Sequence, residues 1–581
     1  MSTFLPQHDP EPEARREELA ERRRNYEYCY DYISPLAMIK KVPIKEQPSL
    51  KWLLMFMDRA LQLLGNLIEI EKDQKTLAKH RRRHAQFAKM ASLGTPDVKK
   101  LLEYLEDCLA KTIPSERPES FDYYADIFRM IRLPAVHKDF AEDEVFARMR
   151  VAGPNPVIIT RVAELHDRFP VTETIYRAVM GDDTLDAAGK EGRLYLADYG
   201  ILSFVENGSF PFPQKYVYAP LALFAVDKTT RRLRPVAIQA RQEPGEDNPI
   251  FTPHDGTGWL IAKTIVETAD GTFHEPVSHL ARTHLFVEPF VVATHRNLAP
   301  SHPLHLLLVP HFEGTLAINN AAQGVLVAPG RGVDQLLGGT IDSDRLAAVK
   351  GARGLPFNEA MPPRQFAARG VDDPALLPDY PYRDDALAYW GAIRDWVADY
   401  LGIYYRSDAE VRADPELADW IREVGSHDGG RVSGIDRSIE SFAYLVDTVA
   451  LVLYTSSVQH AAVNFPQYDL MSYCPNMPLA LYAPAPRSKE GITEQDYLDM
   501  LPPKTAALTQ QAILYLLGSI HYTTLGEYPR RHFHDHRVAA PLKAFGARLR
   551  TIGDRIKLEN RGRRQPYTTL LPGSIPQSIN I

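Results

Sequence analysis

The chain has 581 residues, 45% of them apolar, and a formal net charge of −7 at pH 7. This balance is typical of a globular protein with a large core, and the mild acidity argues against nucleic acid as a partner. No apolar run reaches the roughly 18 residues that span a bilayer, and the charged N-terminus lacks a hydrophobic signal segment. Three scattered cysteines indicate no disulfide framework. We therefore expect a cytoplasmic protein.

The N-terminal part of the chain has the composition of helices. Residues 11–24 are charged and rich in helix-forming residues, and residues 49–109 carry an apolar stripe beside a basic cluster at 79–84. We interpret the basic cluster as a solvated face, with transient contact of these helices with a membrane surface as the alternative. We expect a helical N-terminal extension over residues 1–115, which ends in a proline-containing linker that starts at Thr112.

The rest of the chain, residues 116–581, is predicted to be one large domain. Segments within about 190–240 alternate apolar and polar residues, which indicates a small β subdomain. Helical patterns dominate beyond Phe251. The predicted fold class is mainly α, with the small β subdomain inside a large helical domain.

Two pairs of potential metal ligands lie in the helical region. His460 and Asn464 are four residues apart, so one helix face can direct both side chains to one ion. His279 and His284 are five residues apart, and at about 100° per residue an α-helix would point them in different directions. A π-type turn, with i→i+5 bonding, brings such a pair together. We predict this distortion between His279 and His284.

These four residues and the terminal carboxylate of Ile581 can supply a complete set of ligands for one metal ion. Imidazoles combined with oxygen donors suit iron that takes part in oxygen chemistry. A zinc protease is excluded by count, because three residues separate Glu275 from His279 where that motif has two. Four further histidines lack a partner at ligand spacing and are interpreted as ordinary core or surface residues: His295, His302, His305 and His311.

The residues around these pairs resemble the lipoxygenase family. The resemblance extends over roughly residues 120–581 and rests on seven segments: 259–263, 274–275, 278–284, 288–294, 302–303, 310–311 and 318–319. Many lipoxygenases carry an N-terminal β-sandwich domain, but this N-terminus does not read as alternating strands. We expect helices in its place, as in the shorter bacterial members.

The resemblance implies one non-haem iron bound by His279, His284, His460, Asn464 and the Ile581 carboxylate, with neither haem nor nucleotide. The expected reaction removes a bis-allylic hydrogen from a polyunsaturated fatty acid and adds O2, which gives a hydroperoxide. The fatty acid and O2 are the expected partners of a monomeric enzyme. Three alternatives stay open: manganese in place of iron, isomerisation of hydroperoxides, and a catalytically silent lipid-binding protein.

The same resemblance implies roles for residues near the ligands. Glu275 and Gln467 are expected to support the ligands through hydrogen bonds. Ala322 lies where Ala accompanies S and Gly accompanies R stereochemistry in the family, so an S hydroperoxide is expected. Five residues are expected to line the substrate pocket, with two leucines at its floor and a glycine that leaves room for the acyl chain: Leu280, Phe465, Leu336, Leu337 and Gly271.

Overall fold

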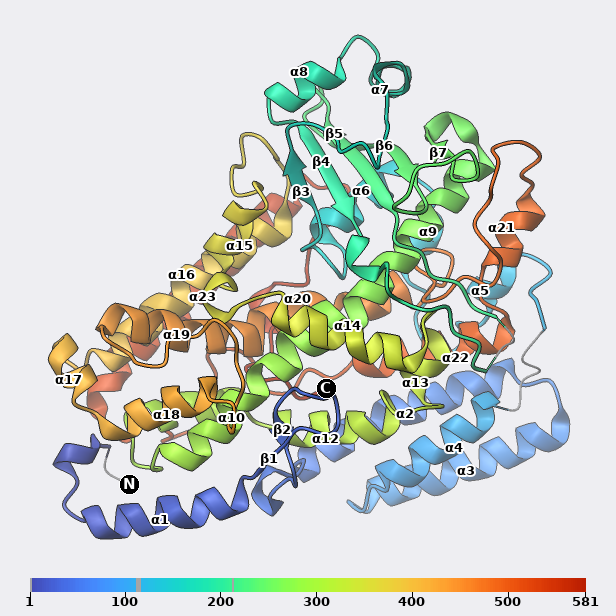
Figure 1. The fold of residues 1–581 in the computed structure, drawn as a ribbon. Coiled ribbons are helices and arrows are strands. Elements are labelled where there is room, and N and C mark those ends of the chain that lie inside the picture. The colour runs from blue at the N-terminus through green and yellow to red at the C-terminus, as the bar shows by residue number, and fades with distance from the viewer. Residues whose placement is uncertain (1–2, 111–115, 212–213) are drawn as a thin grey trace.

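Helices dominate the computed structural model, and strands are confined to two small sheets (Figure 1). The structure describes residues 3–110, 116–211 and 214–581. The start of the predicted linker and the predicted domain boundary after residue 115 fall on 111–115, which lie outside the described residues. The mainly α fold class is confirmed.

The N-terminal part is helical, with one short two-stranded ribbon. Its elements are α1 (Pro12–Asn25), β1 (Tyr28–Cys29), β2 (Met38–Ile39), α2 (Leu50–Ile70), α3 (Gln74–Ser92) and α4 (Val98–Ala110). The Ser49 side chain caps α2 by accepting a hydrogen bond from the Trp52 backbone N–H at 3.2 Å. Apolar residues of α2 and α4 share one hydrophobic cluster with α22 (Lys504–Leu517), so these helices pack directly on the rest of the protein.

The larger sheet has five antiparallel strands in the order β3-β4-β5-β6-β7. The strands are β3 (Thr160–Val162), β4 (Leu194–Asp198), β5 (Leu221–Val226), β6 (Leu233–Gln239) and β7 (Ile250–Phe251). Every residue of the central strand β5 is buried. Its two faces belong to different apolar clusters, one with Phe146 and Trp259 and the other with Tyr176. This burial on both faces explains why β5 is apolar throughout.

Two long helical runs cross the interior. The first consists of α9 (Thr257–Phe273), the π-helix η6 (His274–His284) and α10 (Leu285–Asn297). The second consists of α19 (Phe442–Tyr454), the π-helix η9 (Thr455–Gln459), α20 (His460–Asn464) and the π-helix η10 (Gln467–Met471).

The second run is the candidate for a membrane span among the described residues. Phe442–Met471 is long and apolar enough to cross a bilayer by length and composition, because η9 and α20 extend the apolar stretch of α19. Inside the protein, 72% of its most apolar window is buried. Core helices of soluble proteins pass the same test, and this helix contains two of the predicted ligands.

The remaining helices surround these two runs and the sheet (Figure 1). They are α5 (Asp122–Asp126), α6 (Asp143–Ala152), α7 (Glu173–Met180), α8 (Leu185–Lys190), α11 (Pro303–Leu308), α12 (Thr315–Val325), α13 (Gly332–Leu336), α14 (Ile341–Arg353), α15 (Pro362–Ala368), α16 (Pro381–Leu401), α17 (Asp408–Arg412), α18 (Pro415–Gly425), α21 (Glu494–Met500) and α23 (Ala539–Asn560).

The C-terminal tail is buried between distant parts of the chain. The Ser578 hydroxyl donates to the Glu313 carbonyl at 2.8 Å, and the Thr315 hydroxyl donates to the Ile579 carbonyl at 3.0 Å. From α2, the Trp52 indole N–H donates to the Asn580 carbonyl at 2.7 Å. The N-terminal helices therefore help to hold the last residues in place.

We predict that Trp52→Phe lowers the free energy of unfolding by about 1–3 kcal/mol, because the buried Asn580 carbonyl would lose its donor. Urea unfolding measures the change. Leu50→Ala, on the same helix at a side chain that is 54% exposed, is the control and should change stability by no more than about 0.5 kcal/mol. Equal stability of Trp52→Phe and the wild type would contradict this account of the tail.

Candidate metal centre

The helix that carries the first histidine pair is π-helical over His274–His284, which confirms the distortion predicted from the spacing. Pro276 lies within this segment and has no backbone N–H, so one α-helical hydrogen bond cannot form there. The wider turn places the Nε2 atoms of His279 and His284 3.2 Å apart. Two imidazoles that an α-helix would separate thus face each other.

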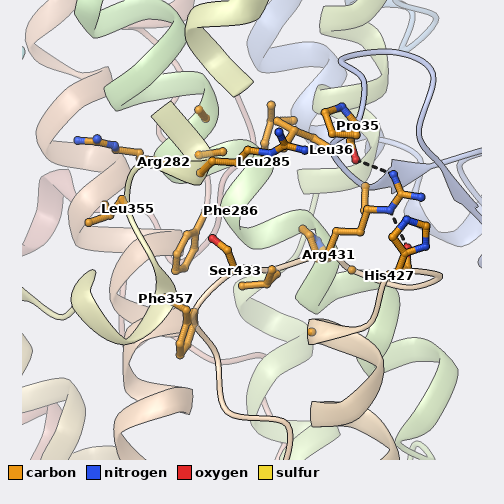
Figure 2. Close-up of a pocket in the computed structure, with 18 of the residues that line it drawn as sticks. Pro35, Leu36, Arg282, Leu285, Phe286, Leu355, Phe357, His427, Arg431 and Ser433 are labelled. Atoms are coloured by element: carbon orange, nitrogen blue, oxygen red, sulfur yellow. Dashed lines mark hydrogen bonds between the residues drawn. The ribbon is translucent and has the colours of Figure 1, made fainter. Parts of the chain in front are cut away.

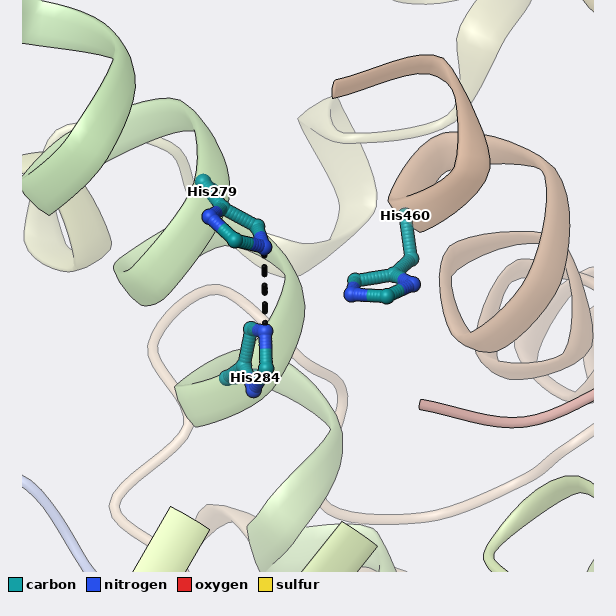
Figure 3. A group of neighbouring side chains, drawn as sticks. All are labelled: His279, His284 and His460. Atoms are coloured by element: carbon teal, nitrogen blue, oxygen red, sulfur yellow. Dashed lines mark hydrogen bonds between the residues drawn. The ribbon is translucent and has the colours of Figure 1, made fainter. Parts of the chain in front are cut away.

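His460 from α20 completes a group of three buried imidazoles (Figure 3). One ligand atom from each histidine lies within 4.8 Å of the others. The ring centroid of His460 is 5.4 Å from that of His279 and 5.1 Å from that of His284. Both ring nitrogens of His460 are buried without a hydrogen-bond partner among the described residues. Such an orphaned donor set is suited to a metal ion.

The three rings are uncharged at neutral pH. Burial, together with the neighbouring His279, lowers the pKa of His284 to about 3. Burial also lowers the pKa of His279 and brings that of His460 well below its usual range. Neutral imidazoles keep a lone pair for a metal, so no proton has to be displaced when the ion binds.

A chain of hydrogen bonds fixes the orientation of His284. Asn319, on α12, directs its amide Nδ2 to the Glu288 carboxylate at 2.7 Å, and its Oδ1 lies 2.7 Å from His284 Nδ1. His284 Nδ1 is therefore the donor, which leaves the Nε2 lone pair free to face His279. The other Glu288 oxygen accepts from the backbone N–H of Ile39 in β2 at 2.7 Å. All four residues are buried.

Asn464 and Ile581 lie in the same region. Asn464 is buried, its Nδ2 donates to the Leu517 carbonyl at 3.0 Å, and its Oδ1 accepts from Gln467 Nε2 at 2.9 Å. An amide oxygen has a second lone pair, which stays available for a metal. Ile581 is 3% exposed and its backbone contacts His460. A buried terminal carboxylate needs a cation, and a metal beside the three imidazoles would supply one.

Glu275 lies on the other side of His279. Its carboxylate is 3.8 Å from His279 Nδ1 and 3.4 Å from His274 Nδ1. Burial raises the pKa of Glu275, but the two histidines outweigh burial and hold it at about 2. Among the described contacts Gln467 bonds to Asn464, as expected, but no hydrogen bond joins Glu275 to Gln467.

The residues expected to form the pocket fall in separate apolar clusters, with Leu336 and Leu337 in one, Leu280 beside a second and Phe465 beside a third. Leu336 and Leu337 pack in a cluster of large flexible side chains that includes Met471, Met477 and Leu479. A Cβ atom added to Gly271 would lie 2.8 Å from the Leu479 side chain, so Leu479 takes up the space beside this glycine. Leu280 and Phe465 are half-buried, and the Phe465 ring stacks on His521 with centroids 3.9 Å apart.

The four histidines interpreted as ordinary residues are buried in the core and lie outside the group of three. His302 pairs with Asp414 at 3.0 Å, and His311 bonds the Tyr528 hydroxyl at 2.9 Å. His295 stacks on Tyr26 with centroids 4.5 Å apart. His305 packs edge-on against His295.

Some supporting residues were not singled out from the sequence. Glu288 and Asn319 contributed only to the family pattern, and Ile39 and Trp52 carried no site assignment. The Glu-Pro sequence at 288–289, inside an apolar helix, was the available signal for a buried carboxylate. The fold and the site together define a helical protein with a buried group of three histidines that is able to bind a metal ion.

Comparisons with known proteins give the family. The lipoxygenase family model matches residues 42–567. A linoleate 9/13-lipoxygenase from Pseudomonas aeruginosa is 44% identical over 80% of this chain and 70% of its own length. A polyunsaturated fatty acid lipoxygenase from Homo sapiens, ALOX15B, is 37% identical over 78% of this chain and 68% of its own. A crystal structure of a LOX deletion variant in complex with arachidonate matches with a TM-score of 0.87 at 31% identity, covering 100% of this chain and 84% of that one.

The chain therefore belongs to the lipoxygenase family, as the resemblance implied, and is an enzyme with fatty acid dioxygenase activity.

We predict that Asn319→Leu lowers metal affinity about 10- to 100-fold, because the His284 Nδ1–H would be buried without an acceptor. Metal content after dialysis against a graded chelator series measures the effect. Asn320→Leu is the matched control, one residue along the same helix, and should retain metal like the wild type. Equal retention by both variants would show that Asn319 does not orient His284.

Proposed function

We propose that this lipoxygenase is an iron enzyme that converts polyunsaturated fatty acids and O2 to S-configured hydroperoxides. One observation carries the proposal: three neutral imidazoles converge in the core, and the buried C-terminal residue contacts one of them. Three nitrogen donors, one amide oxygen and one carboxylate form a ligand set suited to non-haem iron.

His279, His284, His460, Asn464 and the Ile581 carboxylate would hold the metal. Iron bound there supplies the one-electron redox chemistry that a reaction between O2 and a closed-shell fatty acid requires. The protein contributes the positions of the groups. The π-helical turn aims two imidazoles at one point, and Asn319 sets the tautomer of His284. The apolar residues around the centre exclude water from the reacting carbons.

The substrate assignment is supported by the relatives. One bacterial relative is named for linoleate, and the structural match was solved with arachidonate bound. Both are polyunsaturated acids with bis-allylic carbons, the positions from which a hydrogen atom is most easily removed. The methionines and leucines near Leu336 and Leu337 form an adaptable apolar surface that suits a flexible acyl chain.

The S configuration is assigned from Ala322. It lies three residues after Asn319 on α12, so both residues occupy the same face of the helix. Asn319 touches His284, and an Ala322 side chain on the same helix face would point toward the same region of the site. One methyl group at this position would restrict which end of the substrate radical O2 can reach.

We predict that one alanine added after Ile581 abolishes metal binding and oxygenation, because it converts the terminal carboxylate into a neutral peptide group. Metal analysis and O2 uptake with linoleate measure both losses. The control is Ile581→Val, which keeps the carboxylate at nearly the same volume and should retain metal. Full metal and turnover in the extended protein would exclude the carboxylate as a ligand.

We predict that arachidonate yields a single S hydroperoxide, and that Ala322→Gly raises the R fraction at least tenfold by opening the second end of the radical to O2. Chiral chromatography of the products measures both enantiomers. Ala321→Gly, at the exposed neighbour, is the control and should leave the product unchanged. A wild-type R product would reject the role of Ala322 and leave the oxygenase assignment intact.

A further inference from the structure

A cavity of about 320 Å³ lies against a second face of the helix that carries His279 and His284 (Figure 2). The helix contributes residues three or four positions apart, which form one stripe: Ala281, Arg282, Leu285, Phe286 and Pro289. The opposite walls are the loop 35–37 and the segment 425–437. Neither the three clustered histidines nor the expected pocket residues line this cavity.

The volume and the walls are suited to a small ligand. Ligand sites typically have volumes of about 300–1,000 Å³ and are mostly apolar, with a few polar groups that set orientation. Here the apolar walls are formed by Leu36, Leu285, Phe286, Leu355 and Phe357.

The charges that line the cavity have one sign. A smaller chamber of about 50 Å³ shares Arg282, Phe286 and Leu355 with the main cavity, so the two adjoin. Across both, the lining includes no aspartate or glutamate among the described residues but contains five arginines: Arg282, Arg353, Arg369, Arg431 and Arg437. Arg353 and Arg437 are exposed, whereas Arg282, Arg369 and Arg431 are half-buried.

Arg282 lies where the cavities meet, and its charge is not balanced. Its Nε donates to the Gly351 carbonyl at 3.3 Å, and no described carboxylate pairs with it. A desolvated guanidinium without a counter-ion is costly, and an anion bound beside it would relieve that cost.

The small chamber contains a further unpartnered polar atom. Arg369 Nε is buried and has no hydrogen-bond partner among the described residues, and the Tyr454 hydroxyl is buried beside that of Tyr382. Tyr454 is 2% exposed and lines this chamber together with Gln459 and Thr455. Donors that are buried and unused are expected where a ligand supplies the acceptor.

We propose that this cavity is a second ligand site, which binds a carboxylate on an unbranched apolar chain, with the carboxylate at Arg282 and the chain along Leu285, Phe286 and Phe357. The site is separate from the metal centre and requires no double bonds in its ligand. It therefore accepts saturated fatty acids, which the enzyme cannot oxygenate. Its existence does not depend on the identity of the metal or on the product configuration.

Isothermal titration calorimetry of the full-length, metal-loaded protein with decanoate tests the proposal. Leu355 lines both cavities and is half-buried, so Leu355→Trp should fill the space where they meet. Leu346→Trp is the matched control on the nearby helix α14, at a side chain that is 44% exposed and outside both cavities. We expect one class of decanoate binding to be present in the wild type and Leu346→Trp and absent from Leu355→Trp. Identical titrations of all three proteins would overturn the proposal.

Two further arms test the chemistry of the ligand. Arg282→Gln should weaken this class of binding at least tenfold, and Arg282→Lys should restore part of it, with thermal unfolding verifying that both variants fold. Decanol should not occupy the site, and inorganic phosphate should not displace decanoate from it. Equal binding of decanol would reject the role of the arginine. Displacement by phosphate would reject the apolar chain and leave only a site for small anions.

Oxygen uptake with linoleate distinguishes failure of this proposal from failure of the proposed function. An active enzyme without the second class of binding rejects the cavity site alone. An inactive protein that still binds decanoate through Arg282 and Leu355 rejects the dioxygenase assignment alone.

Discussion

The π-helical winding of one buried turn is the constraint on which the metal centre depends. Five residues separate His279 from His284, and only the i→i+5 pattern directs both rings to a common point. A π-helix packs its backbone less favourably than an α-helix, so the surrounding contacts must stabilise it. Pro276 contributes by removing the N–H of a competing α-helical bond, and burial keeps the imidazoles uncharged.

The centre is assembled from remote parts of the chain, each of which brings a different kind of restraint. The helix of His460 supplies a third ring, and the tail brings the buried residue Ile581 beside it. Thr315, at the start of α12, and Trp52, on α2, donate hydrogen bonds to backbone carbonyls of the tail. Buried backbone carbonyls require hydrogen-bond donors, and these contacts fix the position of the last residues.

Local features of the sequence predicted much of this. The spacing of the ligands predicted the π-helical turn between His279 and His284 and the shared helix face of His460 and Asn464, because both depend only on helical geometry. Alternation of apolar and polar residues within about 190–240 indicated the β subdomain, but the outer strands β3 and β7 lie outside that range and are too short to be recognised. The pairing of Glu288 with Ile39 spans 249 positions of sequence, and no local pattern encodes such a contact. The position of the Leu479 side chain beside Gly271 could not be predicted either. A glycine in the sequence indicates that space exists but does not indicate which side chain fills it.

The hydrogen bond from Ile39 has a consequence for how the molecule can be divided. A helical extension followed by a catalytic domain is a convenient description of the chain. The extension nevertheless contributes to the centre, because the backbone N–H of Ile39 donates to Glu288 and the Trp52 indole donates to the carbonyl of Asn580 in the tail. A protein cut at the apparent boundary near residue 115 would contain every proposed ligand and still lack two of the groups that hold them. The smallest unit able to maintain this centre is thus larger than the segment that contains its ligands, and any shortened or transplanted version has to retain the ribbon and the second helix.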